Sequence, residues 1–107
     1  MACVRKGYNK VIFVGQIENS PELRRTPQGV AIGAFSLYVP KSRAQEEHVL
    51  VDVVVFRSLA EEYCPLLTVG RTVLVEGVLA PYRWHKVDDA RQRVYEVHAT
   101  TIRILGE

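Results

Sequence analysis

The single tryptophan of this 107-residue chain, Trp84, stands outside every apolar run, between Arg83 and the pair His85-Lys86. A tryptophan of the core would have apolar neighbours, so this ring is expected to project from the surface. An exposed indole flanked by cations can stack on a nucleobase, and each such contact contributes about 1–3 kcal/mol. The alternative interpretation is a contact at the rim of the barrel or with another subunit.

Four further aromatic residues could take part in the same chemistry. Phe56 ends an apolar run and precedes Arg57, so burial in the core and contact with a base are both open to it. Tyr38, Tyr82 and Tyr95 lie within or beside other apolar runs. Tyrosine serves cores and binding faces alike, because it has an apolar ring and a polar tip.

Basic residues are distributed among these aromatic residues, and ten of the fourteen are arginines. The planar guanidinium matches the geometry of a phosphate better than the ammonium of lysine does. Each neutralised phosphate releases counterions, which makes binding salt-dependent. The candidate phosphate contacts are Lys10, Arg24, Arg25, Lys41, Arg43, Arg71, Arg83 and Lys86.

The net charge of +2 conceals an uneven distribution. Residues 1–43 hold seven Lys or Arg against two Glu, whereas residues 44–64 hold one Arg against five acidic residues. The acidic residues include Asp52 and the pair Glu46-Glu47, which would repel a polyanion that they faced. Charge therefore permits a nucleic-acid partner without requiring one.

No constellation for catalysis or metal binding is present. His48, His85 and His98 have no nucleophile at a useful spacing, and no nucleotide-binding, metalloprotease or hydrolase motif occurs. Cys3 and Cys64 are too few for a disulfide framework and have no metal-ligand spacing. We expect a protein that is not an enzyme, with no cofactor, no metal and reduced thiols. No apolar run reaches eighteen residues, so no membrane partner is expected.

Five apolar runs with partial period-two alternation predict β-strands. Gly15 and Gly33 fall inside two of them and predict a bulge or sharp bend. Turns are predicted where proline and glycine gather, for example over residues 26–29. The predicted strands cover residues 9–17, 30–39, 49–56, 71–79 and 93–104.

The segment 57–70 predicts a short helix instead. Ser58 and Glu61 have the spacing of a capping box, Pro65 should shorten the helix, and Gly70 should end the segment. One helical face would carry Leu59, Tyr63 and Leu66.

The order of elements predicts the fold class. Five strands with one helix between the third and the fourth describe the OB-fold, an all-β Greek-key barrel that binds oligonucleotides or oligosaccharides. A projecting hairpin is expected between the fourth and fifth strands. We expect one domain over residues 1–107, with its core at about residues 7–105. An unrelated β-barrel or an α+β sandwich fits the same pattern.

An ordered set of motifs resembles the bacterial single-stranded DNA-binding protein family. The set covers nearly the whole chain, and its order and spacing make it specific where each piece alone is weak. A more distant resemblance is to primosomal replication protein B. The motifs are Tyr8–Ile17, Pro21–Arg24, Thr26–Gly29, Ala34–Leu37, Val53–Phe56 with Leu59–Glu61, Gly70–Leu79, Tyr82–Trp84 and Tyr95–Val97.

The resemblance implies a homotetramer that wraps single-stranded DNA without sequence preference in DNA replication, recombination or repair. Two stacking positions of the family fall on Phe56 and Trp84. A third, in a Trp-His-Arg run, is replaced by residues 50–52, Leu-Val-Asp, and the loop with Lys41 and Arg43 lacks a fourth. Because two stacking positions are lost and a net charge of +2 compensates little, binding weaker than is typical of the family is expected. The family's acidic C-terminal tail, which recruits other proteins, has no counterpart.

The first strand carries the expected assembly contact. A bare apolar edge is an aggregation hazard, and pairing with a second copy of itself would give a two-fold dimer. The resemblance implies that two dimers then join, whereas primosomal replication protein B is a dimer. A protein-interaction module without DNA binding is the remaining alternative. The resemblance implies a cytoplasmic, nucleoid-associated protein, and an organellar location fits equally. The residues of this dimer strand are Val11, Ile12, Phe13 and Val14.

Overall fold

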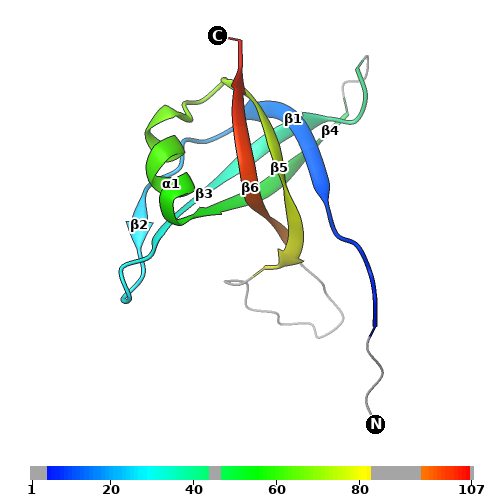
Figure 1. The fold of residues 1–107 in the computed structure, drawn as a ribbon. Coiled ribbons are helices and arrows are strands. Elements are labelled where there is room, and N and C mark those ends of the chain that lie inside the picture. The colour runs from blue at the N-terminus through cyan, green and yellow to red at the C-terminus, as the bar shows by residue number, and fades with distance from the viewer. Residues whose placement is uncertain (1–4, 44–46, 83–94, 107) are drawn as a thin grey trace, which may run out of the picture.

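The computed structural model describes residues 5–43, 47–82 and 95–106, and it is dominated by strands (Figure 1). The predicted strands all form, each within two residues of the expected bounds, and a two-residue strand that the sequence did not indicate adds to them. In chain order the elements are β1 Val11–Ile17, β2 Arg24–Arg25, β3 Ala31–Pro40, β4 His48–Phe56, helix α1 Arg57–Tyr63, the 3-10 turn η1 Cys64–Leu66, β5 Thr72–Pro81 and β6 Tyr95–Leu105.

The strands form one sheet in the order β1-β5-β6-β4-β3-β2, which closes because β1 also pairs with β3. Two ladders are long: β3–β4 with nine residue pairs and β5–β6 with ten. Two seams are short. The parallel β4–β6 seam and the antiparallel β1–β3 seam have two residue pairs each. The prediction of a closed five-stranded OB barrel with one short helix is confirmed.

The core lies inside this barrel because alternate strand residues point inward. Along β3, for example, Phe35 and Leu37 are buried while Ala34 and Ser36, which alternate with them, are more accessible. Branched aliphatic side chains fill most inward positions and suit a pleated surface. The buried residues at inward strand positions are Ile17, Ala31, Phe35, Leu37, Val53, Val55, Val73, Val75, Val97, Ala99 and Ile102.

Gly15 and Gly33 mark close approaches rather than the predicted bulges. A Cβ at Gly15 would overlap the carbonyl oxygen of Tyr38, and one at Gly33 would overlap the Sγ of Cys64. The register shift among the described strand pairs lies elsewhere, between Glu76 and Gly77. Glycine is required at positions 15 and 33 because the backbone of Tyr38 and the side chain of Cys64 leave no room for a Cβ.

Helix α1 begins one residue before the predicted cap. Its N-cap is Phe56, with no side-chain capping bond, so the capping box at Ser58 and Glu61 is wrong. The chain leaves β4 extended at Phe56, and Arg57 then adopts a left-handed φ of 60°. That conformation costs a residue with a side chain roughly 1–2 kcal/mol, and it starts the helix immediately after the strand.

The buried side of this segment also differs from the predicted stripe. Ala60, Cys64 and Leu67 are buried, whereas Leu66 is 43% exposed. Pro65 ends α1 as expected, and residues 64–66 continue as a 3-10 turn. The tighter turn advances each residue by a third of a turn, so Leu67 rotates inward in place of Leu66. Neither of the helical segments described is long and apolar enough to cross a membrane.

Candidate nucleic-acid interface

The barrel surface formed by β3 and β4 carries most of the candidate side chains. Outward positions of the two strands lie opposite one another, from the pair Ile32–Phe56 to the pair Pro40–His48. With about 3.3 Å per residue, this surface is about 26 Å long. We call it the β3–β4 face, and it comprises Ile32, Ala34, Ser36, Tyr38 and Pro40 with His48, Leu50, Asp52, Val54 and Phe56.

Phe56 ends this face beside strand β6. Its ring meets the imidazole of His98 edge-on, with centroids 5.0 Å apart and planes at 75°. The Nε2 of His98 in turn lies 2.6 Å from Oε2 of Glu96, a side chain that is 2% exposed. The buried carboxylate therefore fixes the imidazole, and the imidazole supports the half-buried phenyl ring.

The other end of the face carries a second aromatic pair. The rings of Tyr38 and His48 stack with centroids 4.3 Å apart and planes at 25°. Leu50 lies directly opposite Tyr38 and is 54% exposed. At the tip, Nζ of Lys41 forms an ion pair of 3.0 Å with Glu47. Flat rings and an exposed aliphatic side chain thus stand together at this end.

The centre of the face is polar. Asp52 lies opposite Ser36, whose hydroxyl donates a hydrogen bond of 3.3 Å to Oδ1 of Asp52. The backbone N–H of Ser36 donates to Oδ1 of Asn19 over 2.8 Å. Within residues 5–43, 47–82 and 95–106, no cation forms an ion pair with Asp52.

An open groove of about 770 Å³ adjoins the Phe56 end of the face. Ile32 and Ala34 line it from the face itself, and Arg24 and Arg25 line it from β2. Phe56 stands directly opposite Ile32 in the ladder. The groove therefore lies beside the position opposite Phe56, and two arginines border it.

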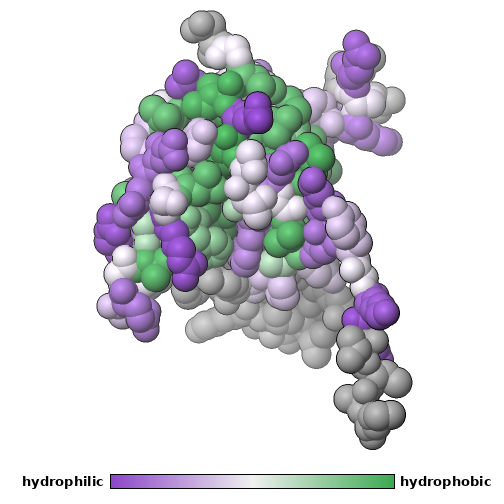
Figure 2. Space-filling view, in the orientation of Figure 1, coloured by the Kyte–Doolittle hydropathy of each residue, from purple (hydrophilic) through white to green (hydrophobic). Residues whose placement is uncertain are grey.

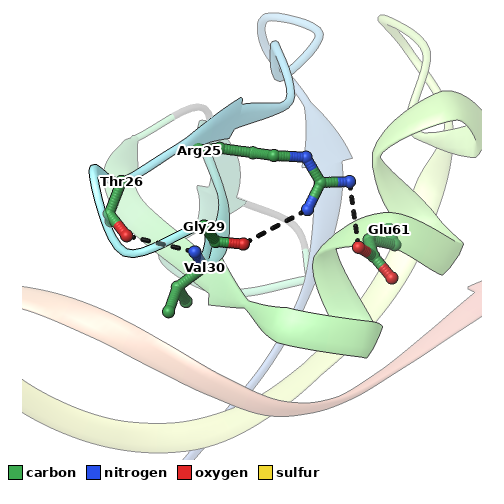
Figure 3. A network of polar contacts seen from close by, with 5 residues as sticks. All are labelled: Arg25, Thr26, Gly29, Val30 and Glu61. Carbon is green, nitrogen blue, oxygen red and sulfur yellow. Dashed lines mark hydrogen bonds and ion pairs between the residues drawn. The ribbon is translucent and has the colours of Figure 1, made fainter.

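Both arginines of the groove have carboxylate partners. Arg24 forms an ion pair of 3.0 Å with Glu22, and Arg25 forms one of 3.0 Å with Glu61 of α1. Arg25 also donates to the carbonyl of Gly29 over 3.4 Å, so it bridges the turn and the helix (Figure 3). Exposed ion pairs contribute only about 0–1 kcal/mol, and a phosphate can replace such a carboxylate at little cost.

Other predicted phosphate contacts lie away from this face. Lys10 is exposed just before β1, and Arg43 is exposed beyond the end of β3. Arg71 precedes β5, where its guanidinium donates to the carbonyl of Leu66 over 3.2 Å. The contact of Arg71 ties the end of η1 to the start of β5. Arg83 and Lys86 lie outside the described residues.

Two of the predicted stacking residues also stand apart. Tyr95 is 50% exposed, but it alternates with Glu96 and therefore points to the opposite side of β6 from the ring that supports Phe56. Tyr82 is half-buried at the end of β5. Trp84 lies outside the described residues. The structure thus brings Phe56 and Tyr38 onto one face and leaves Tyr95 off it.

Sequence reasoning missed four residues at this face. His48 and Ser36 occupy the same outward positions as Tyr38 and Phe56, so strand alternation could have found them. His98 meets Phe56 only because β6 runs beside β4, and no local pattern reports that pairing. Arg57, exposed directly after Phe56, carries no local signal of its left-handed conformation.

No group of three or more His, Cys, Asp or Glu side chains comes together as a possible metal site in the part of the chain that the structure describes. Burial raises the pKa of the Cys64 thiol, which keeps it protonated and unreactive at neutral pH. The chemistry available on the β3–β4 face is therefore stacking, hydrogen bonding and ion pairing.

A closed OB barrel with an open, ring-bearing face is an architecture that binds single-stranded oligomers. The profile of the single-strand binding protein family matches residues 8–105. The chain belongs to that family, as the motifs of the sequence indicated, and the resemblance to it is confirmed.

Several characterised relatives are similar over most of the chain. Single-stranded DNA-binding protein 2 of Staphylococcus aureus (strain Mu50) is 34% identical over 101 residues, which is 91% of this chain and 72% of that protein. The single-stranded DNA-binding protein of Thermotoga maritima is 33% identical over 104 residues, covering 92% and 74%. That of Bacillus cereus is 34% identical over 101 residues, covering 91% and 59%.

Proposed function

We propose that this protein binds single-stranded DNA on its β3–β4 face, in DNA replication, recombination or repair. One observation carries the proposal: Phe56, Tyr38 and Leu50 stand on a single open face with an arginine-lined groove at one end. Membership of the single-strand binding protein family supports it. The role is binding rather than catalysis.

The arrangement suggests how a strand would lie. Bases stack on the apolar and aromatic side chains at the two ends of the face, because every base has a π-surface. Arg24 and Arg25 at the groove and Lys41 at the tip hold phosphates. Asp52 at the centre repels phosphates, so the backbone keeps to the borders and the bases turn inward. Trp84 adds a further stacking surface in this proposal.

Homo-oligomerisation through β1 is the second part of the proposal. Strand β1 pairs with β5 along Val11–Gln16, but it pairs with β3 only at Gln16 and Ile17. Among the described residues, the other edge of Val11–Gly15 therefore has no strand partner. The same edge of a second copy would satisfy its backbone groups and give a two-fold dimer.

The outer surface beside that edge is apolar. Ile12 is 53% exposed, Val14 46% and Leu105 37%, and Leu74 lies opposite Val14. Figure 2 shows hydrophobic side chains (green) over the upper part of the side on which Figure 1 displays β1, β5 and β6. Two dimers joined through such surfaces give the proposed homotetramer, which would act in the cytoplasm at the nucleoid.

Titration with oligo-dT at rising salt concentration tests the binding proposal. Quenching of Trp84, the only tryptophan, reports binding, and a duplex of equal length is the control. Affinity should fall steeply with salt, and the single strand should bind at least tenfold more tightly than the duplex. Equal affinity for both, or no binding at low salt, would overturn the proposal and favour a protein-interaction role.

A further inference from the structure

The polar centre of the β3–β4 face separates this chain from a purely sequence-indifferent platform. Asp52 is exposed and lies between the exposed Leu50 and the half-buried Phe56 on the same strand. A carboxylate in this position opposes the phosphate backbone. It can only be accommodated in a complex if bases, and not phosphates, lie over it.

The carboxylate is held in place rather than free to turn away. The hydroxyl of Ser36 donates to Oδ1 over 3.3 Å, from the residue directly opposite in the ladder. Oδ1 keeps a second lone pair beside this contact, and Oδ2 has no polar partner among the described residues, so both oxygens of the exposed carboxylate can accept a hydrogen bond. A carboxylate accepts hydrogen bonds and donates none.

A donor stands on the other side of Ser36. Oδ1 of Asn19 accepts the backbone N–H of Ser36 over 2.8 Å, which fixes the orientation of the amide. Its Nδ2 then remains available, because Asn19 forms no further hydrogen bond within residues 5–43, 47–82 and 95–106. Asp52 and Asn19 thus contact one residue from its two sides, through its hydroxyl and its backbone N–H, and Asn19 also lines the groove.

We propose that Asp52, anchored by Ser36, selects guanine bases in the single strand that this face binds. An unpaired guanine presents N1–H and the N2 amino group side by side, and this pair of donors matches the two oxygens of a carboxylate. Thymine offers a single donor, N3–H, and the carbonyl oxygens on both sides of it are repelled by the carboxylate. Watson–Crick edges are free to be read in single strands.

This inference rests on the proposed function and adds to it. Stacking and phosphate contacts bind any sequence, and the Asp52 site superimposes a bias on them. A well-placed bidentate contact to a base discriminates by roughly fivefold or more, so the bias should be measurable. Cytosine and adenine have one amino group each and should rank between guanine and thymine.

The test compares four DNA strands of equal length by fluorescence anisotropy at one low salt concentration. They are oligo-dT and alternating dT-dG, dT-dA and dT-dI, in which inosine lacks only the N2 amino group of guanine. The wild-type protein should bind dT-dG at least fivefold more tightly than dT-dI. In Asp52→Asn, which keeps the hydrogen bond from Ser36, this ratio should fall below twofold.

Glu62→Gln is the matched control, because it removes the same charge from an exposed side chain on α1, where no described contact involves it. It should raise affinity for all four strands equally and keep the preference for dT-dG. A wild-type ratio below twofold, or a ratio unchanged in Asp52→Asn, overturns the guanine site while DNA binding itself stands. If no strand binds to the wild type, the proposed function fails instead, and the two failures are distinguishable.

Discussion

Gly33 lies where strand β3 passes close to the segment after helix α1, and we expect its replacement by alanine to destabilise the fold. The added Cβ would overlap Sγ of Cys64 and lie 3.2 Å from Cγ2 of Val55. Cys64 is 6% and Val55 0% exposed, so neither can move aside freely. Overpacking of this kind costs about 1–3 kcal/mol, which the reduced entropy of the unfolded chain offsets by only about 0.4–1 kcal/mol.

Replacing Cys64 by alanine in the Gly33→Ala variant should relieve this cost. Cys64→Ala alone removes the sulfur and leaves a methyl-sized gap, at a cost of about 1 kcal/mol. In the double variant the new methyl group at position 33 occupies that gap. The loss in the free energy of unfolding should therefore be about 1–2 kcal/mol smaller than the sum of the two single losses, within the range for residues in contact.

Urea unfolding followed by far-UV circular dichroism measures all four free energies at one protein concentration, because the stability of the proposed oligomer would depend on concentration. Gly15→Ala combined with Cys64→Ala is the control. A Cβ at Gly15 meets the backbone carbonyl of Tyr38, which loss of the sulfur cannot relieve, so those two costs should add. Additive losses for the Gly33–Cys64 pair would refute the packing argument.

Three further predictions concern binding, assembly and pH. Trp84→Ala should weaken oligo-dT binding, measured by anisotropy, at least tenfold, or about 1.4 kcal/mol. Tyr8→Ala, which removes a ring that is 90% exposed before β1, should leave the affinity unchanged. Equal affinity of Trp84→Ala and the wild type would exclude stacking by Trp84. Ile12→Lys should yield monomers or insoluble protein in sedimentation. Val69→Lys, at a similarly exposed position in a loop, should keep the wild-type mass. A monomeric wild type at micromolar concentration would contradict the β1 contact. Burial raises the pKa of Cys64, so as pH rises the thiol ionises in the unfolded chain before it does in the folded protein. The stability of the wild type relative to Cys64→Ala should therefore decline from about pH 8 to 10. Parallel profiles of stability against pH would show that the thiol ionises equally in both states.

The main strands could be predicted because their signal is local. The alternation in β3, with Phe35 and Leu37 inward and Ser36 and Tyr38 outward, follows directly from the period of a strand. The turn at Thr26–Gly29 could be predicted from its proline and glycine. The structure has this turn, with a φ of 87° at Gly29, whose N–H donates to the carbonyl of Thr26 over 2.8 Å. The element order then identified the OB barrel.

The helix start and its buried stripe were less predictable. Ser58 and Glu61 have the spacing of a capping box, but the left-handed Arg57 begins the helix earlier and leaves Ser58 inside it. The 3-10 turn at residues 64–66 changes the period after Tyr63, so Leu67 is buried in place of Leu66. Both differences depend on how the helix fits against the barrel, which the local pattern does not contain.

The candidate face was predictable in part. The resemblance identified Phe56 as a stacking position, and it treated Leu50 and Asp52 as losses. That the three share one face follows from β4 itself, yet the support of Phe56 by His98 and of Asp52 by Ser36 depends on neighbouring strands. Strand partners far apart in sequence are set by topology, and the topology became visible only in three dimensions.

The two short seams divide the barrel into two extensively paired parts, which we call plates. The β3–β4 ladder and the β5–β6 ladder, which β1 extends, each have many residue pairs, while the β4–β6 and β1–β3 seams have two pairs each. Local opening occurs where the fewest interactions must be broken, so amides at the seams should exchange with solvent before those within the plates. The proposed DNA face belongs to one plate and the proposed assembly edge to the other. Strain exerted by a bound strand would therefore reach a neighbouring subunit through two narrow hinges.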